Sequence, residues 1–424
     1  MTDYHKMWNV IGLDLEKHDK LLNVLRAIYS DVYLSQKNRP KGMEYFDFVI
    51  SEVHGLRIKE LLEHKAKGGK VVGTFCVYVP DEIIMAAGGV GVGLCGGTQF
   101  SIPDAQKILP QNLCPLIKSA FGFKLAKICP YFEVADFLVG ETTCDGKKKV
   151  WEILNDYAPI HVMEVPHMKK NRDKELWFKE VKAFKEKMEE ESGIKITPEL
   201  LEEKIKLVNK KRLALKRIFE VRKALPPPIS GKDALLISQI AFYDDVERFT
   251  KKVNELYDEL EDRIKKGIGI VKKDTPRIMI CGCPMALPNW KLHHIIEESR
   301  AVVVCEESCV GTRYFTHMVK EDCPSMEEKI KAIADRYLKI NCSCFTPNEE
   351  RIEQIVQYTK DFKVNGVIYY TLQFCHTYYM EFIKVKSALK KANVPVLEII
   401  TDYSPGDEGQ LKTRVEAFIE QILQ

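Results

Sequence analysis

Short hydrophobic runs alternate along this chain with longer stretches whose apolar positions recur at helical spacing. The short runs are rich in β-branched residues and end in glycine, cysteine or proline, which predicts strands followed by helices, as in an α/β fold. Four strands are predicted in the first half, at 70–75, 88–94, 135–141 and 160–165. Four more are predicted in the second half, at 277–280, 301–304, 366–372 and 394–400.

The segments outside these runs have a helical pattern. Residues 171–267 are dense in Lys and Glu, and their apolar positions predict one long helix that ends before the prolines at 226–228, then a second from about 232 to 266. The first 66 residues also show a helical apolar face. The pattern divides the chain into four parts: a helical N-terminal segment (1–66), a first α/β domain (67–170), a helical connector (171–275) and a second α/β domain (276–424).

The amino-acid composition is typical of a globular protein. The chain has 424 residues, of which 45% are hydrophobic, enough for two or three domains with real cores. Its 64 Lys and Arg against 61 Asp and Glu leave a net charge of +3, which gives no electrostatic case for a nucleic-acid or membrane partner. The N-terminus lacks the apolar core of a signal peptide, and no window approaches the ~18 apolar residues of a spanning helix. We therefore expect a cytoplasmic protein.

Thirteen cysteines raise the question of metal chemistry. In a reducing compartment they are thiols, either buried apolar side chains or ligands for a soft metal. The stretch MICGCP at 279–284 places Cys281 and Cys283 one residue apart, which suits either a metal site or a strand-end turn. No CxxC pair or ferredoxin run is present. Dispersed cysteines remain compatible with an iron-sulfur cluster assembled between domains.

Six cysteines form two triplets with nearly equal spacing. Cys144 and Cys375 each stand between a predicted strand and a helix, and stepping back from them by 30 and 31 residues, then by 38 and 35, reaches further cysteines. The matched pairs are Cys144 with Cys375, Cys114 with Cys344, and Cys76 with Cys309. Because parallel strands open on one sheet edge, three thiols from each half would converge there. Chance is the alternative, since thirteen cysteines offer many triplets. Six thiols exceed the needs of one [4Fe-4S] cluster and suit two cubanes or a larger cluster.

Other motifs are weaker. Gly88–Gly93 is glycine-rich without the GxGxxG spacing and acidic partner of a dinucleotide fold, and no P-loop is present. These glycines are interpreted as letting the backbone pass close to a bulky ligand. Carboxylates stand at predicted strand ends, but the residues alone assign none of them a catalytic role.

Several segments carry a family resemblance. LPQNLCPLIKSAFG, ETTCDGKKKVWEIL, SCVGTRYF, DRYLKINCSCFTPNEERIEQI and GVIYYTLQFCHTY resemble the 2-hydroxyacyl-CoA dehydratase and benzoyl-CoA reductase family, across about residues 66–424. Within it, the chain resembles the single-chain double-cubane cluster proteins. The resemblance implies two similar parallel-sheet domains, flavodoxin- or Rossmann-like, which face each other across a cluster cleft, and a homodimer.

The resemblance also implies a ligand set. The family's [4Fe-4S] ligands would fall on Cys76, Cys114 and Cys375. The second cubane of an [8Fe-9S] double cluster would take Cys144, Cys309 and Cys344, with a sulfide joining the two cubanes. Cys283 is the main rival to Cys309, since it ends the first strand of the second half. The cluster itself would be the reactive group, and the catalytic side chains stay unknown.

The function implied is that of an ATP-dependent reductase component. Low-potential electrons would come from a separate ATP-hydrolysing iron-sulfur activator and reduce a small molecule, in an anaerobic host. The alternative is a subunit of a 2-hydroxyacyl-CoA dehydratase, which holds one [4Fe-4S] cluster and needs a different second subunit. A third hypothesis is a non-catalytic electron carrier with an exposed cluster.

Overall fold

The computed structural model describes residues 4–424 and contains two four-stranded sheets whose strands are all parallel. The first has the order β2-β1-β3-β4 and the second the order β6-β5-β7-β8. The first sheet consists of β1 (Lys70–Thr74), β2 (Gly89–Gly93), β3 (Phe137–Glu141) and β4 (Ile160–Met163). The second consists of β5 (Arg277–Gly282), β6 (Val302–Glu307), β7 (Gly366–Leu372) and β8 (Val396–Thr401). The predicted α/β class with two parallel sheets is confirmed.

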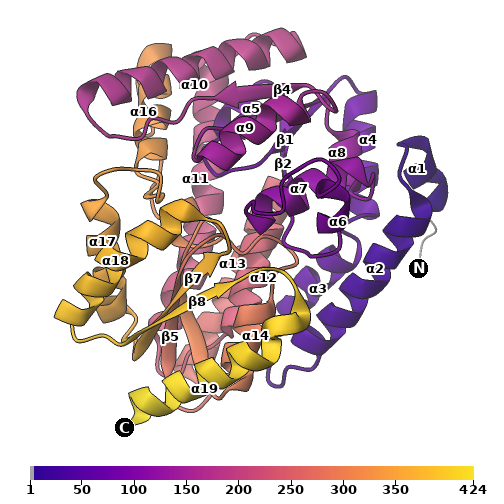
Figure 1. Ribbon diagram of the computed structural model, residues 1–424. Helices are drawn as coiled ribbons and strands as arrows, with labels where there is room; N and C mark the ends of the chain where they lie inside the picture. The colour runs from indigo at the N-terminus through magenta and orange to yellow at the C-terminus, as the bar shows by residue number, and fades with distance from the viewer. Residues whose placement is uncertain (1–3) are drawn as a thin grey trace.

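Helices connect and cover the strands of both sheets. Around the first sheet they are α5 (Asp81–Ala86), α6 (Ile102–Ala105), α7 (Pro115–Leu125), α8 (Pro130–Val134) and α9 (Asp145–Leu154). Around the second they are α14 (Lys291–Glu298), α15 (Thr312–Phe315), α16 (Met326–Leu338), α17 (Glu349–Asp361), α18 (His376–Lys391) and α19 (Glu408–Leu423), with the short 3-10 turn η3 (Pro405–Asp407) before α19. In Figure 1 the first sheet lies in the upper half of the molecule and the second in the lower half.

The remaining segments are helical, as their patterns predict. The N-terminal helices are α1 (His5–Val10), α2 (Leu15–Tyr29), α3 (Met43–Ser51) and α4 (Leu56–Ala66), with a π-helical turn η1 (Ser30–Leu34) after α2. The central helices are α10 (Asn171–Ser192), α11 (Pro198–Glu220), α12 (Gly231–Ile240) and α13 (Val246–Lys265), and the 3-10 turn η2 (Val221–Lys223) follows α11. None of the described helices is long and apolar enough to cross a bilayer.

One predicted helix is wrong in detail. The stretch from about 232 to 266 is two helices, because the chain breaks between α12 and α13. Asp245 caps the second helix, and its carboxylate accepts from the backbone nitrogens of Glu247 and Arg248 at 3.1 and 3.0 Å. An aspartate side chain that satisfies free N–H groups at a helix start favours a new helix over a continued one. The apolar periodicity runs through both helices and hides this break.

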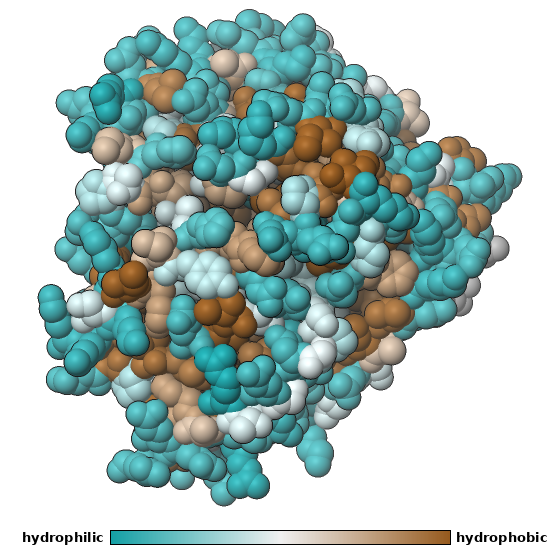
Figure 2. All heavy atoms as spheres, viewed as in Figure 1, coloured by the Kyte–Doolittle hydropathy of each residue, from teal (hydrophilic) through white to brown (hydrophobic). Residues whose placement is uncertain are grey.

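A continuous hydrophobic core runs through both sheets and the central helices. Buried hydrogen bonds between helices add to the packing of this core. The Arg212 guanidinium on α11 donates to the Glu82 carboxylate of α5 at 2.5 Å and to the Tyr337 hydroxyl of α16 at 2.9 Å. The Gly97 nitrogen donates to the Leu287 carbonyl at 2.9 Å, and a Cβ on Gly97 would lie 2.2 Å from the Ala286 oxygen. This glycine therefore permits close contact between the two halves of the protein. The face in Figure 2 is mainly hydrophilic, with apolar residues in smaller areas.

Candidate functional site

The ends of the parallel strands surround a cavity of about 410 Å³. In each sheet the strand order reverses between two central strands, β1 and β3 in the first and β5 and β7 in the second. Crevices at such switch points are the usual ligand sites of open α/β sheets. Residues that follow all four of these strands line the cavity, so the two sheets contribute to one site.

Nine of the thirteen cysteines line this cavity, and all thirteen are free thiols. The nine are Cys76, Cys95, Cys114, Cys144, Cys283, Cys309, Cys342, Cys344 and Cys375. All six predicted site cysteines are therefore brought to one place from both halves of the chain. The sequence spacing does not point to Cys95 or Cys342 and offers Cys283 only as a rival to Cys309, whereas the cavity includes all three.

Local structure explains how single cysteines reach the cavity. Cys114, Cys144 and Cys375 are the residues immediately before α7, α9 and α18. A helix N-terminus carries partial positive charge and free N–H groups, which favour an anionic sulfur. The Lys147 backbone nitrogen lies 3.5 Å from the Cys144 sulfur and donates to it. Cys144 and Cys375 are thus presented by short strand-to-helix turns, and Cys114 by the loop between α6 and α7.

Matching the cysteines of the two halves by the position of their strands in each sheet gives different pairs from matching them by sequence spacing. Cys76 follows β1, and the topological equivalent of β1 is β5, which is followed by Cys283. Cys95 follows β2, whose equivalent β6 is followed by Cys309. The match between Cys144 after β3 and Cys375 after β7 agrees with the spacing. The spacing also matches Cys76 with Cys309, but the strand order does not support this match. Residue counts include loops of unequal length.

Contacts between thiols define two groups of cysteines, one at each end of the cavity. The Cys114 and Cys283 thiols donate to the Cys375 sulfur and lower the pKa of Cys375 well below its usual value. At the other end, the neighbouring Cys76 thiol lowers the pKa of Cys309. The structure thus places Cys76 beside Cys309, whereas the resemblance groups it with Cys114 and Cys375.

Two more thiols lie in the loop between α16 and α17. The Cys344 thiol donates to Cys342 and, in spite of burial, lowers the pKa of Cys342 to about 6. Cys309 contributes to the raised pKa of Cys344, so this pair belongs to the same end as Cys76 and Cys309. A lowered pKa increases the thiolate fraction, and the thiolate is the form that binds metal.

A buried lysine-glutamate pair borders the first-sheet side of the cavity. Lys147 lies in the lining, and its ammonium pairs with the Glu141 carboxylate at the end of β3. The Thr143 hydroxyl donates to the same carboxylate at 3.1 Å. Burial acts to lower the pKa of Lys147, but Glu141 and the thiols of Cys76 and Cys95 outweigh it and raise the pKa. Lys147 therefore carries a positive charge beside these thiols.

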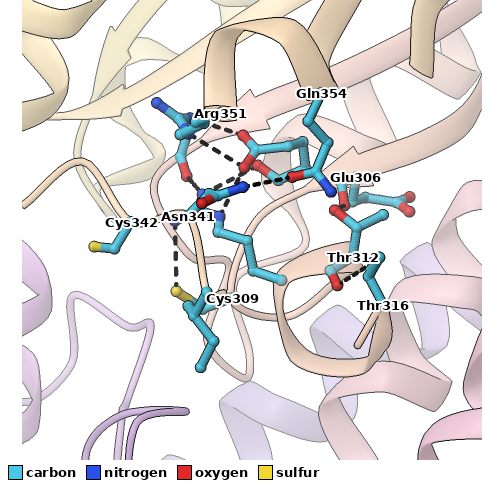
Figure 3. A network of polar contacts seen from close by, with 12 residues as sticks. Glu306, Cys309, Thr312, Thr316, Asn341, Cys342, Arg351 and Gln354 are labelled. Atoms are coloured by element: carbon cyan, nitrogen blue, oxygen red, sulfur yellow. Dashed lines mark hydrogen bonds and ion pairs between the residues drawn. The ribbon is translucent and has the colours of Figure 1, made fainter. Parts of the chain in front are cut away.

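A second buried ion-pair network borders the opposite side. Arg313 on α15 pairs with Glu307 at 2.9 Å, and Glu307 also binds Arg351 at 2.7 Å. Arg351 pairs in turn with Glu381 of α18. The Arg313 guanidinium reaches the Cys309 sulfur, with Nη1 to Sγ at 3.6 Å. Figure 3 shows Arg351 and Cys309 among these polar contacts, with one dashed line at the Cys309 sulfur.

The donor set fits an iron-sulfur cluster. Among residues 4–424, no three His, Cys, Asp or Glu side chains form a group that could hold one metal ion. A cluster binds its thiolates at separate iron atoms, so its ligands need not meet at one point. Nine thiols around one apolar cavity supply the soft ligands that iron-sulfur clusters require.

Comparison with known proteins shows the family of this chain. Residues 76–422 match the family model of the 2-hydroxyglutaryl-CoA dehydratase D-component. The chain is 39% identical over 378 residues to the putative dehydratase subunit YjiM of Escherichia coli, which covers 88% of this chain and 96% of that protein. It is 23% identical over 372 residues to the (R)-phenyllactyl-CoA dehydratase beta subunit of Clostridium sporogenes, covering 86% and 95%. It is 21% identical over 358 residues to a subunit of the benzoyl-CoA reductase of Thauera aromatica, covering 83% and 91%.

Proposed function

Because the chain belongs to the 2-hydroxyglutaryl-CoA dehydratase D-component family, we propose that it is the reductase component of an ATP-dependent system and holds a double-cubane [8Fe-9S] cluster. The family includes dehydratase and reductase subunits, which supports an enzymatic role. The low-potential electrons would come from a separate ATP-hydrolysing iron-sulfur protein. The substrate would be a small molecule reduced in the cavity, and the working form would be a homodimer.

The number of thiols around one cavity carries this proposal. A single [4Fe-4S] cluster takes at most four cysteine ligands, and nine cysteines line the cavity here. Cys144, Cys309 and Cys344 are among them, and one cubane ligated by Cys76, Cys114 and Cys375 would leave all three without a role. Two joined cubanes would use all six cysteines, with Cys76 and Cys309 at one end and Cys114 and Cys375 at the other.

The chain's own residues would hold the cluster and control its surroundings. When bound, the cluster would supply low-potential electrons to a substrate beside it. Lys147 and Arg313 place two positive charges against the thiolates and offset part of their negative charge. His167 and His376 line the cavity and are exposed, so the cavity reaches solvent on their side. Histidine is a common proton donor and acceptor in proteins, so these two side chains could pass protons from water to the cavity.

A second candidate is a dehydratase subunit with one [4Fe-4S] cluster. It is favoured by the relatives named as 2-hydroxyacyl-CoA dehydratase beta subunits, which match 86% and 85% of this chain. Such a protein would require a different second subunit and would bind an acyl-CoA.

Anaerobic iron and sulfide analysis of the purified protein distinguishes the two. About eight irons per chain supports the double-cubane reductase, and about four supports the dehydratase subunit. One iron or none, or zinc, contradicts both candidates.

A Cys144→Ala variant adds a second test. The double-cubane proposal expects it to lose iron or change its cluster spectrum, because Cys144 would be a ligand. Cys323→Ala is the matched control, since Cys323 is a buried free thiol outside the cavity lining. Equal iron content and spectra in the two variants would remove Cys144 from the ligand set.

A further inference from the structure

Arg313 holds a fixed position at one end of the thiol cavity. Its side chain is buried, and Nη1 lies 3.6 Å from the Cys309 sulfur and also bonds the Tyr378 hydroxyl. Nη2 bonds the carbonyl oxygens of Gly282 and Glu307, which end β5 and β6. Four partners from two strand ends, a loop and a helix leave the guanidinium no other orientation. The donor to the Cys309 sulfur is therefore preorganised.

The buried charges around Arg313 sum to zero, but their arrangement is directional. Glu307 and Glu381 compensate the two arginines of the network, Arg313 and Arg351. Glu307 binds Arg313 at Nε, while the Nη1 end of the guanidinium faces Cys309. The sulfur thus meets the positive end of a buried ion pair. Buried pairs of this kind contribute little net stability, so stability alone is a poor explanation for this arrangement.

The other end of the cavity has neutral donors. The Cys283 sulfur accepts from the Leu372 backbone nitrogen at 3.4 Å, and the Cys375 sulfur lies 3.9 Å from the Thr377 hydroxyl. Hydrogen bonds in which the donor is charged are roughly twice as strong as neutral ones. The two thiol groups therefore differ in electrostatic environment: Arg313 donates to a sulfur at the Cys76–Cys309 end, where Lys147 adds a second positive charge beside Cys76.

We propose that Arg313 is a positioning residue that raises the reduction potential of the iron held by Cys309, so that the first electron to arrive settles at the Cys76–Cys309 end of the cavity. This inference rests on the proposed function, since it requires a cluster in the cavity. Hydrogen bonds to the sulfur ligands are among the factors that set cluster potentials. A positive charge beside a sulfur stabilises the reduced, more negative state. The electron would then pass from this end to the substrate or to the iron held by the second set of thiols.

The test is a spectroscopic redox titration of the loaded, full-length protein and an Arg313→Gln variant. Glutamine keeps much of the side-chain volume and removes the charge. We expect the ratio of reduced to oxidised cluster at a fixed potential to fall at least tenfold, which is about 59 mV for a one-electron couple. Arg277→Gln is the matched control, because Arg277 is also buried but lies at the start of β5 and donates to carbonyl oxygens of Phe362 and Arg222. The reduction potential of the cluster in the Arg277→Gln variant should equal that in the unaltered protein.

Iron content is measured on every sample, which separates the role of Arg313 from the proposed function. If the unaltered protein binds no iron, the proposed function fails. If Arg313→Gln keeps its iron and its potential is unchanged, the role of Arg313 is refuted and the proposed function stands.

If Arg313→Gln does not retain iron, Arg313→Lys and Tyr378→Phe decide the question. Lysine keeps the charge but loses the fork that reaches the sulfur, so its potential should fall by less than that of the glutamine variant. Phenylalanine removes the competing acceptor of Nη1, so its potential should rise. Unchanged potentials in both would overturn the proposal.

Discussion

The Cys283 sulfur accepts a hydrogen bond from the Leu372 backbone nitrogen at 3.4 Å and faces the thiol cavity. Cys281, two residues earlier, is fully buried within β5 and does not line the cavity. Residues two apart in a strand share a face. Here the left-handed φ of +130° at Gly282 turns the chain between the two cysteines. The pair is therefore one core thiol and one cavity thiol.

This difference predicts unequal effects of the same substitution. Cys283→Ala should lower iron content or change the cluster's electron paramagnetic resonance spectrum, because a thiol beside Cys375 would be lost from the ligand region. Cys281→Ala removes an equally buried thiol outside the cavity and should leave both properties unchanged. Iron analysis and spectra of the two variants check this. Equal iron contents and spectra would exclude Cys283 from cluster binding.

Gly282 itself should not tolerate a side chain. Its φ is +130°, and a Cβ would lie 2.0 Å from the Tyr370 carbonyl oxygen. Gly282→Ala should therefore lower the free energy of unfolding by about 2 kcal/mol or more, and the displaced turn should reduce iron content. Urea unfolding and iron analysis measure the two effects.

Gly409→Ala is the control for that substitution. Gly409 lies in the first turn of α19, and a Cβ at this position would meet nothing within 4 Å. Alanine there should be neutral or stabilise by about 0.5–1 kcal/mol. Equal losses of stability in the two variants would show that the Gly282 turn is not required.

Acid should weaken the buried Arg222–Glu306 pair, whose guanidinium and carboxylate are 2.6 Å apart. Burial alone would raise the pKa of Glu306, but Arg222 and His293 outweigh it and lower the pKa to about 2. The stabilisation is present above the unfolded carboxyl pKa of about 4.5 and is lost as the pH falls toward 2. Its magnitude is about 3 kcal/mol.

A Glu306→Gln variant isolates this contribution. At pH 7 it should be less stable than the unaltered protein, because Arg222 keeps its charge without a charged partner. The difference in the free energy of unfolding should shrink as the pH falls from about 5 toward 3, where Glu306 gains a proton in the unfolded chain of the unaltered protein. A difference that stays constant over this range would contradict the lowered pKa.

Much of the fold follows from local pattern. Each of the eight predicted strands overlaps an observed one, because β-branched runs bounded by glycine, cysteine or proline have few other stable conformations in a buried parallel sheet. The break before Asp245 does not show in the pattern, since a capping side chain leaves the apolar periodicity intact. The signal for the break is Asp245 itself, since aspartate is a preferred residue at the start of a helix.

The site is less predictable than the fold. The spacing matches Cys144 with Cys375 correctly, because the same strand-to-helix turn surrounds each of them. It does not reveal Cys95 or Cys342, because residue counts do not show which loops reach the switch points of the two sheets. Strand order decides this, and it arises from packing between distant segments. The contact of Arg313 with Cys309 cannot be predicted from the sequence for the same reason, since it depends on how α15 folds.

The most direct measurement is an iron anomalous difference map from crystals of the protein grown without oxygen. The double-cubane assignment predicts two adjacent groups of four irons in the cavity between the two sheets, one nearest Cys76 and Cys309 and the other nearest Cys114 and Cys375. A single group of four irons, or no iron signal within the cavity, would contradict that assignment.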